Sequence, residues 1–302
     1  MLMTTKANRY AHALIKARAG GTLHPLLTDD GKLTLDDGYD IARSLLNIRI
    51  ANGETPVGRR IGFSNERVRQ RYGKSGPITT PIWSTLFDSS VEYAMDNHAL
   101  HSLSKSQLPR IEPHLVFKLA RTPDANCTLL ELADCLEWMA HGLEVVVSPY
   151  KAWAFDAPDA VAAFGLSRKL IVGEPRMLSR QGRHQLPDVL AAATLSLSKM
   201  TAADSGIAGA GLGRELMGSP LHALHALHRE LHQPAVLRED GGQDEAPSLS
   251  HSTQQLSGFG PLQAGEIIAT GSWTDAMPVK RGEVWASAFA QLNLPGLSLS
   301  FS

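Results

Sequence analysis

The sequence predicts an α+β fold in which a helical N-terminal part precedes a mainly β core. Two amphipathic segments, residues 4–19 and 34–51, come first, and short apolar runs separated by turn residues follow after residue 57. The chain has 302 residues, 43% of them hydrophobic, which is enough for a large core. We therefore expect an N-terminal helical part at 1–57 and a β-rich catalytic-type domain at 58–302, together forming one compact unit.

The two N-terminal helices are marked by their ends. Gly20 and Gly21 stop the first helix, because glycine readily adopts the left-handed conformation that ends a helix. Thr34 is the expected N-cap of the second helix, with Asp37 three residues later in a variant of the capping box. Asn52 and Gly53 end that helix.

In the middle of the chain, segments with the helical period of 3.6 residues alternate with segments that have the strand period of two. Leucines and a methionine at 129, 132, 136 and 139 follow the spacing of one helical face, which predicts an amphipathic helix at 128–140. Ser64 is the expected cap of a short helix. The expected elements are a strand at 58–64, a short helix at 64–72, a loop at 73–81, an extended segment at 81–88, strands at 111–119, 143–147 and 168–173, and a helix at 157–165.

The last third is expected to be mostly β, with one long loop. Residues 233–258 are poor in apolar side chains and rich in Gly, Ser, Gln, Asp and Glu, which indicates an exposed insertion. The other expected elements are a strand around 193–197 within the weakly alternating 188–198, a hairpin turn at 203–206, a strand or loop at 206–213, a helix at 220–232, strand-and-turn segments at 261–274 and 279–289, and a terminal strand at 297–301.

Four histidines recur at intervals of three and four within 220–232. They are His222, His225, His228 and His232. One interpretation is a metal site on a helical face. Leucines at 221, 224, 227 and 231 repeat with the same spacing, one position earlier. The simpler interpretation is therefore a buried leucine stripe with histidines along its margin.

Charge and cysteine content exclude several classes. The net charge of −1 argues against a nucleic-acid-binding surface, which needs an excess of basic residues. Cys127 and Cys135 are the only cysteines, so no disulfide framework is expected, and the protein fits a reduced cytoplasmic location. No apolar run is long enough to span a membrane, and no signal peptide is evident.

Two segments stand out as a candidate site, 110–118 and 140–147. On a strand, Glu112 and His114 point to the same face because side chains repeat every second residue. Glu144 begins an apolar run on a second expected strand. Two carboxylates and one imidazole on neighbouring strands can hold one divalent cation. The alternative is that Glu112 and His114 form the solvent face of an ordinary alternating strand.

Five motifs occur in the order expected for one family. They are Gly58-Arg-Arg-Ile-Gly-Phe-Ser-Asn65, Ile111-Glu-Pro-His114, Ala140-His-Gly-Leu-Glu-Val-Val146, Gly218-Ser-Pro-Leu221 and Ala264-Gly-Glu-Ile-Ile-Ala-Thr-Gly-Ser-Trp-Thr274. Together they resemble the hydratase/decarboxylase branch of the fumarylacetoacetate hydrolase superfamily, which includes 2-keto-4-pentenoate hydratase and 4-oxalocrotonate decarboxylase. The resemblance covers residues 5–302 and is weakest at 233–258.

The resemblance implies a mixed β-roll core and a site for Mg²⁺ or Mn²⁺ held by three carboxylates. In this family the metal binds the 1-carboxylate and 2-keto oxygen of a 2-oxo acid and stabilises its enolate, and a lysine assists. It also implies a homo-oligomer, with association between related decarboxylases and hydratases.

This chain departs from the family pattern at three positions. His114 replaces the second carboxylate of the Glu-x-Glu pair, which makes a softer ion than Mg²⁺ acceptable. Arg60 replaces the lysine, and a guanidinium cannot carry protons at neutral pH. Relatives have an aspartate before an aromatic residue where this chain has Ile82-Trp83, and Asp88 is the nearest acid.

The expected site follows from these matches. Glu112, His114 and Glu144 hold the metal, Arg60, Asp88 and His141 are the catalytic candidates, and Ser272 and Thr274 contact the substrate. The expected activity is a metal-dependent lyase that hydrates a 2-hydroxydienoate or related 2-oxo acid through an enolate. Two alternatives remain: decarboxylation of a 2-oxo-diacid, and a non-catalytic oxo-acid-binding or partner subunit.

Overall fold

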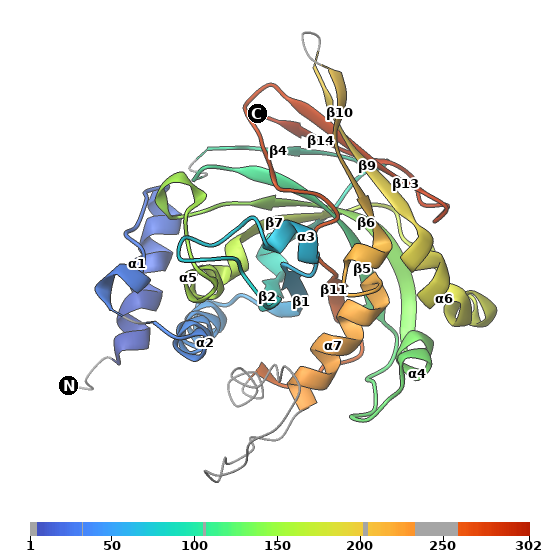
Figure 1. Cartoon of the computed structure of the whole chain (residues 1–302), viewed down its shortest axis with the longest axis horizontal. Helices are drawn as coiled ribbons and strands as arrows, with labels where there is room; N and C mark the ends of the chain where they lie inside the picture. Colours follow the sequence, from blue (N-terminus) through green and yellow to red (C-terminus); the bar gives the residue numbers. More distant parts are fainter. Residues whose placement is uncertain (1–4, 32, 105–106, 202–204, 233–258) are drawn as a thin grey trace.

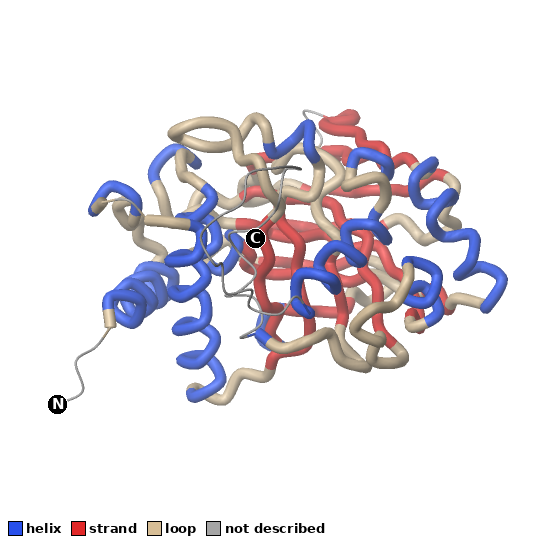
Figure 2. The backbone as a smooth tube through the Cα atoms, turned by 60° about the horizontal axis from the view of Figure 1, so that its bottom comes forward, coloured by secondary structure: helices blue, strands red, loops and turns tan. Residues whose placement is uncertain are grey.

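The strands of the protein form two sheets with helices around them (Figures 1 and 2). The structure is a computed structural model that describes residues 5–31, 33–104, 107–201, 205–232 and 259–302. Helices and strands are both abundant, so the predicted α+β class is confirmed. The expected boundary at residue 57 stays a prediction, and it falls inside the first strand, β1 (Pro56–Gly62).

The larger sheet is mixed and, within the described residues, has nine strands. Their path is β2-β1-β11-β5-β6-β7-β3, while β12 pairs with β5 and β8 with β6. β1–β11 and β3–β7 are parallel, and the other pairs are antiparallel. The strands besides β1 are β2 (Ile82–Phe87), β3 (Val91–Tyr93), β5 (Arg110–Leu119), β6 (Leu136–Val146), β7 (Ser167–Val172), β8 (Arg176–Met177), β11 (Ile267–Ala269) and β12 (Met277–Pro278).

The smaller sheet has the order β10-β9-β13-β14-β4. Its strands are β4 (His98–His101), β9 (Thr194–Met200), β10 (Ser205–Leu212), β13 (Val284–Ala290) and β14 (Leu297–Phe301). The two sheets pack against each other, because the ring of His141 on β6 lies 4.6 Å from that of Phe289 on β13, centroid to centroid.

Helices gather at two places around the larger sheet, with α1, α2 and α5 on one side and α4, α6 and α7 on the other (Figure 1). The α-helices are α1 (Lys6–Gly20), α2 (Leu35–Ala51), α3 (Glu66–Arg69), α4 (Leu129–Asp134), α5 (Ala157–Ala162), α6 (Arg180–Ala192) and α7 (Pro220–His232). Short 3-10 turns lie at Thr28–Asp30, Asp88–Ser90, Lys151–Trp153, Phe164–Leu166 and Gly213–Glu215. In the described parts of the chain, no helix combines the length and apolar character needed to cross a bilayer.

Both N-terminal helices are confirmed. Gly21 adopts the left-handed conformation at the end of α1, with φ of 65°. At the start of α2 the hydroxyl of Thr34 accepts a hydrogen bond from the backbone of Asp37, whose carboxylate accepts one in return from the backbone of Thr34. This is the predicted capping box.

The helix predicted at 128–140 is wrong in its second half. A capping box at Thr128 begins α4, but the helix ends at Asp134, and Leu136 starts the strand β6. β6 pairs with β5 nearly along its whole length, including Met139 opposite Phe117. The interstrand hydrogen bonds and burial of this central strand override the helical spacing of the leucines.

Two smaller predictions need correction, a helix that was not expected and a helix cap. Residues 180–192 form the unexpected helix α6, while the strand expected around 193–197 is confirmed as β9, which begins at Thr194. Asn65, not Ser64, caps α3, because Asn65 Oδ1 accepts from Val68 N while Ser64 Oγ donates to the Thr270 carbonyl. The glycine-rich 206–213 is strand β10 over most of its length. Residues 203, 204 and 233–258 lie outside the described residues.

The leucine stripe of α7 is confirmed. Leu221, Leu224 and Leu227 are fully buried. The neighbouring histidines bond to separate partners: His225 Nε2 lies 2.9 Å from the Cys127 carbonyl, and His228 Nε2 lies 2.9 Å from that of Asp124. Each of these two rings therefore contacts a different backbone carbonyl, and the two do not share a partner.

Candidate metal and substrate site

The three predicted ligand side chains converge. The register of β5 and β6 places Glu112 opposite Glu144, and His114 opposite Gly142. Ligand atoms of Glu112, His114 and Glu144 all lie within 4.8 Å of one another, and they are the only such group of three or more acidic, histidine or cysteine side chains among the described residues. His114 Nε2 is 3.1 Å from Glu144 Oε2 and 3.4 Å from Glu112 Oε2.

A glycine on β6 makes room for the Val116 side chain and the Cβ atom of His114. A Cβ atom at Gly142 would lie 2.7 Å from Val116 Cγ2 and 3.3 Å from His114 Cβ. Any larger residue at position 142 would therefore push against the strand that carries His114. The motif Ala140-His-Gly-Leu-Glu144 thus supplies one ligand and the space for another.

Arg60 on β1 joins both carboxylates. Its Nε donates to Glu144 Oε2 at 2.6 Å, and its Nη2 donates to Glu112 Oε2 at 3.0 Å. Its Nη1 donates to the carbonyl of Gly165 at 2.7 Å. Gly62 leaves space for this guanidinium, since a Cβ there would come within 2.6 Å of Nη1. The arginine is therefore fixed by three acceptors on different segments.

Burial and ion pairing shift the pKa values of this cluster in opposite directions. Burial alone would raise the pKa of Glu144, but Arg60 and then His114 outweigh it and lower that pKa to about 2. Burial alone would lower the pKa of His114, yet the Glu112 and Glu144 carboxylates raise it above its usual value. For Arg60 too, the two carboxylates outweigh burial, and its pKa is raised. Glu144 and Arg60 therefore stay charged in the folded protein.

Two buried groups in the cluster lack hydrogen-bond partners among the residues that the structure describes. Glu144 Oε1 has none, and both ring nitrogens of His114 have none, because the 3.1 Å contact to Glu144 is not aligned as a hydrogen bond. Leaving buried polar atoms unpartnered costs free energy. Lone pairs of this kind are suited to a cation.

A small cavity reaches this cluster. Arg60 and Glu112 form part of its wall, and Ser272, Asn65 and Tyr72 contribute further polar groups. The apolar part of its wall consists of Phe63, Val68, Trp153 and Leu166. His114 and Glu144 are fully buried behind Arg60 and Glu112. A small ligand in the cavity would therefore meet Glu112 and Arg60 first.

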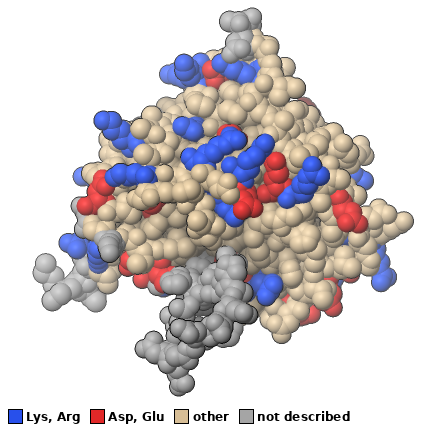
Figure 3. Space-filling model, viewed as in Figure 1, with Lys and Arg blue, Asp and Glu red and all other residues tan. Residues whose placement is uncertain are grey.

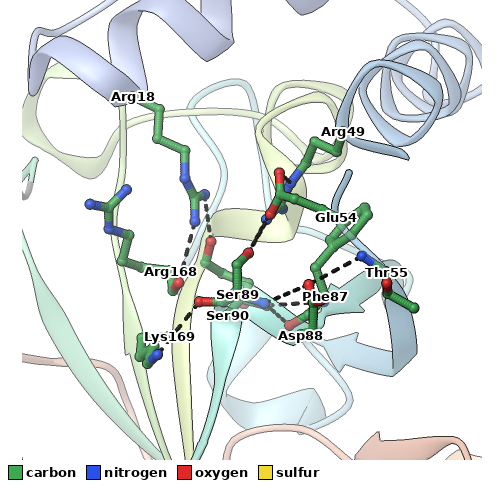
Figure 4. A network of polar contacts seen from close by, with 11 residues as sticks. Arg18, Arg49, Glu54, Thr55, Phe87, Asp88, Ser89, Ser90, Arg168 and Lys169 are labelled. Carbon is green, nitrogen blue, oxygen red and sulfur yellow. Dashed lines mark hydrogen bonds and ion pairs between the residues drawn. The ribbon is translucent and has the colours of Figure 1, made fainter. Parts of the chain in front are cut away.

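Asp88, a predicted catalytic residue, lies elsewhere. It is exposed at the end of β2, where its carboxylate accepts from the backbone of Thr55 at 3.1 Å and of Ser89 at 2.8 Å. Figure 4 shows it in a polar network with Arg49, Glu54 and other side chains. The structure does not bring it together with the carboxylate cluster.

His141 is also separate from the cluster. It is one strand position from Gly142, so its side chain points to the opposite face of β6 from Glu144. Its Nε2 lies 2.9 Å from Ser287 Oγ on the smaller sheet. Burial lowers its pKa to about 4. A neutral imidazole packed between two sheets fits a structural hydrogen bond.

The two predicted substrate-binding hydroxyls differ in position. Ser272 lines the cavity, and its Oγ donates to the Thr274 carbonyl at 2.6 Å. Thr274 is buried, and its Oγ1 donates to the Asp275 carbonyl at 2.9 Å. Ser272 is thus the hydroxyl that a ligand in the cavity could contact.

Sequence reasoning gave no site role to Tyr72 and Gly165. Tyr72 lines the cavity from the segment after α3, and Gly165 presents its carbonyl to Arg60 from a turn with φ of 61°. Neither position has a spacing that links it to the strands β5 and β6. Only the folded chain brings them to the site.

Among known proteins, the chain is similar in sequence to hydratases and to a decarboxylase. No protein-family model matches the chain. It is 26% identical over 281 residues to 4-oxalocrotonate decarboxylase of a Pseudomonas species, covering 92% of this chain and 91% of the relative. It is 28% identical over 285 residues to 2-hydroxyhexa-2,4-dienoate hydratase of Comamonas testosteroni, covering 92% and 90%.

A solved structure has the same fold. The 4-oxalocrotonate decarboxylase from Pseudomonas putida G7, complexed with magnesium and adipate, superposes with a TM-score of 0.78 at 21% identity, covering 100% of this chain and 99% of the other. The expected fold type is therefore confirmed. Over nearly its whole length the chain is thus similar to hydratases and to a decarboxylase, the kinds of protein that its sequence motifs resemble.

Proposed function

We propose that the protein is a metal-dependent lyase acting on a 2-oxo acid or 2-hydroxydienoate. The observation that carries this proposal is the convergence of Glu112, His114 and Glu144 within 4.8 Å beside a small cavity. Relatives that span nearly the whole chain are hydratases and a decarboxylase, which supports the reaction class.

The residues present fit a divalent cation. Glu112, Glu144 and His114 would hold it, and the unpartnered Glu144 Oε1 and His114 Nε2 supply lone pairs at that point. The mixed oxygen and nitrogen donor set suits Mn²⁺ and tolerates Mg²⁺. When bound, such an ion supplies Lewis acidity toward the carboxylate and keto oxygens of a 2-oxo acid.

The chain's own side chains prepare the cavity for an anionic substrate. Arg60 stays protonated, so it acts through its charge and its donors, beside the place where negative charge develops. Ser272 lines the same cavity, and its hydroxyl would donate to a substrate carboxylate after turning away from the Thr274 carbonyl. Phe63 and Leu166 exclude water from the same space, which strengthens these interactions.

Metal analysis and turnover test the proposal together. Purified protein loaded with Mn²⁺ should retain the ion after gel filtration, and it should deplete the ultraviolet absorbance of 2-hydroxypenta-2,4-dienoate or of a diacid analogue. Release of carbon dioxide from a 2-oxo-diacid would identify a decarboxylase instead of a hydratase. Protein that retains no ion and turns over none of these compounds would contradict the proposal.

One observation favours a second candidate, a non-catalytic oxo-acid-binding or partner subunit. The Arg60 guanidinium already bonds the carboxylates of Glu112 and Glu144, so the two acids have a resident counter-cation. The double variant Arg60→Lys with His114→Glu separates the two candidates. Activity that appears only in this variant favours an inactive site in the natural protein, and activity lost in it favours an active, altered site.

A further inference from the structure

A second, wider hollow adjoins the cavity of the candidate site. It has a volume of about 440 Å³, and Tyr72 and Trp153 line both spaces. Two arginines, Arg71 and Arg110, lie in its wall. A ligand bound at Glu112 and Arg60 that extends past the two aromatic rings would enter this hollow.

Arg110 lies on the same strand face as the candidate ligands. It is two residues before Glu112 on β5, so the side chains share a face. Two residues of a strand span roughly 7 Å. Arg110, Glu112 and His114 therefore form a row along β5, with the arginine at the outer end and the buried histidine at the inner end.

The guanidinium of Arg110 is held in place but not neutralised. It lies over the ring of Trp153, 4.3 Å from the centroid, and its Nη1 donates to the Ala276 carbonyl at 3.3 Å. Within the described residues, no carboxylate lies within 4.0 Å of it to form an ion pair. The neighbouring Arg71, by contrast, is paired with Asp275.

This arrangement suits an anion arriving from the inner cavity. A guanidinium fixed on an aromatic ring loses little freedom when it binds, and its remaining donors match the two oxygens of a carboxylate. Glu112 and Glu144 are already paired with Arg60, so Arg110 adds a positive charge that the site does not otherwise need.

We propose that the substrate is a diacid, whose 2-oxo acid end binds at Glu112 and Arg60 and whose distal carboxylate pairs with Arg110. This inference rests on the proposed function, and it chooses between the monoacid and diacid substrates which that function leaves open. Arg110 is then a specificity-determining residue.

Paired ligands of equal chain length test the inference. The probes are 2-oxoadipate, which has the distal carboxylate, and 2-oxohexanoate, which lacks it. Binding of each to the Mn²⁺-loaded full chain is measured by isothermal titration calorimetry. The expected result is at least tenfold tighter binding of 2-oxoadipate. Arg110→Gln should remove this preference while leaving the affinity for 2-oxohexanoate unchanged, and Arg110→Lys should retain part of it.

Arg67→Gln is the matched control. It removes the same charge from α3, outside both spaces, where Arg67 is more than half exposed and pairs with Glu215. It should keep the preference of the natural protein.

Equal affinities for the two probes, or a preference that survives Arg110→Gln, would overturn the diacid inference and leave the proposed function standing. If neither probe binds, both proposals fail. Should Arg110→Gln not fold, the natural protein and Arg110→Lys still decide the question.

Discussion

The sequence presents two candidate metal sites, one on the strands β5 and β6 and one on the helix α7. Only at the first do the ligand atoms come together. Glu112, His114 and Glu144 come from two paired strands and place their ligand atoms within 4.8 Å. The histidines of α7 are closer in sequence, yet His225 and His228 each contact a different backbone carbonyl. Proximity in sequence is therefore a poorer guide to a site than register between strands.

The physical reason is the direction of the side chains. Across an antiparallel pair, directly opposed residues have Cβ atoms about 5 Å apart, so Glu112 and Glu144 face each other. On α7 the leucines occupy the buried stripe, which leaves the histidines at its margin, against whatever backbone lies beside them. Four predictions test this comparison.

The largest expected effect comes from Glu144→Gln. The change removes a charge that Arg60 and His114 both contact in a fully buried place, and breaking such a pair costs roughly 3–5 kcal/mol. Urea denaturation should show this loss in the free energy of unfolding.

Glu137→Gln is the control on the same two strands. It breaks a Lys118–Glu137 pair that is about one-third exposed, and it should cost less than about 1 kcal/mol. Similar losses in both variants would contradict the ranking.

The second prediction concerns a carboxyl group on α7. Burial raises the pKa of Glu230 to about 7, although the Trp83 indole N–H donates to it and opposes the rise. The folded protein thus binds this proton more tightly than the unfolded chain, whose pKa is near 4.5. The stabilisation is complete below pH 4.5 and is lost as the pH rises through 7, by about 3 kcal/mol in total.

Comparison with Glu230→Gln isolates this contribution, since the other groups titrate alike in both proteins. Urea denaturation between pH 4.5 and pH 8 should show the natural protein losing about 3 kcal/mol relative to the variant. Parallel stability curves for the two proteins would show that Glu230 titrates normally.

The third prediction is a metal-dependent rise in stability. Mn²⁺ at a hundredfold excess over its Kd should stabilise the natural protein by about 2.7 kcal/mol, measured as a higher Tm that a chelator reverses. His114→Ala should greatly reduce this rise, while His225→Ala should leave it intact. A rise that depends on His225 would show that the helix histidines, and not the strand residues, hold the ion.

The smallest expected effect is local to α7. Ser219 Oγ accepts from the backbone of His222 at 3.3 Å, and Pro220 follows as the first helical residue, which is an N-cap arrangement. Ser219→Ala should cost about 1 kcal/mol in thermal or urea unfolding and should leave Mn²⁺ binding unchanged. Ser219→Asn should restore most of the stability, because asparagine caps helices equally well.

Local patterns predicted those parts of the fold that depend on neighbouring residues. The capping box at Thr34 and Asp37 acts over three residues, so the sequence alone revealed it. The helix predicted at 128–140 was wrong because its second half pairs with a strand distant in the chain. In the site, too, only relations between residues close in sequence could be predicted. The shared face of Glu112 and His114 follows from period two, but the contact of Arg60 with both acids depends on four strands lying side by side in the order β1-β11-β5-β6.

The sequence by itself determined the α+β class, the resemblance to one family and the residue types able to hold a cation, because periodicity and motif order are properties of the chain. Tertiary structure alone decided that Asp88 and His141 stand apart from the cluster. It also decided that the Arg110 guanidinium stays without a carboxylate partner among the described residues, beside a hollow that adjoins the site. Strand register and packing between distant segments set these positions, and neither can be read from local spacing.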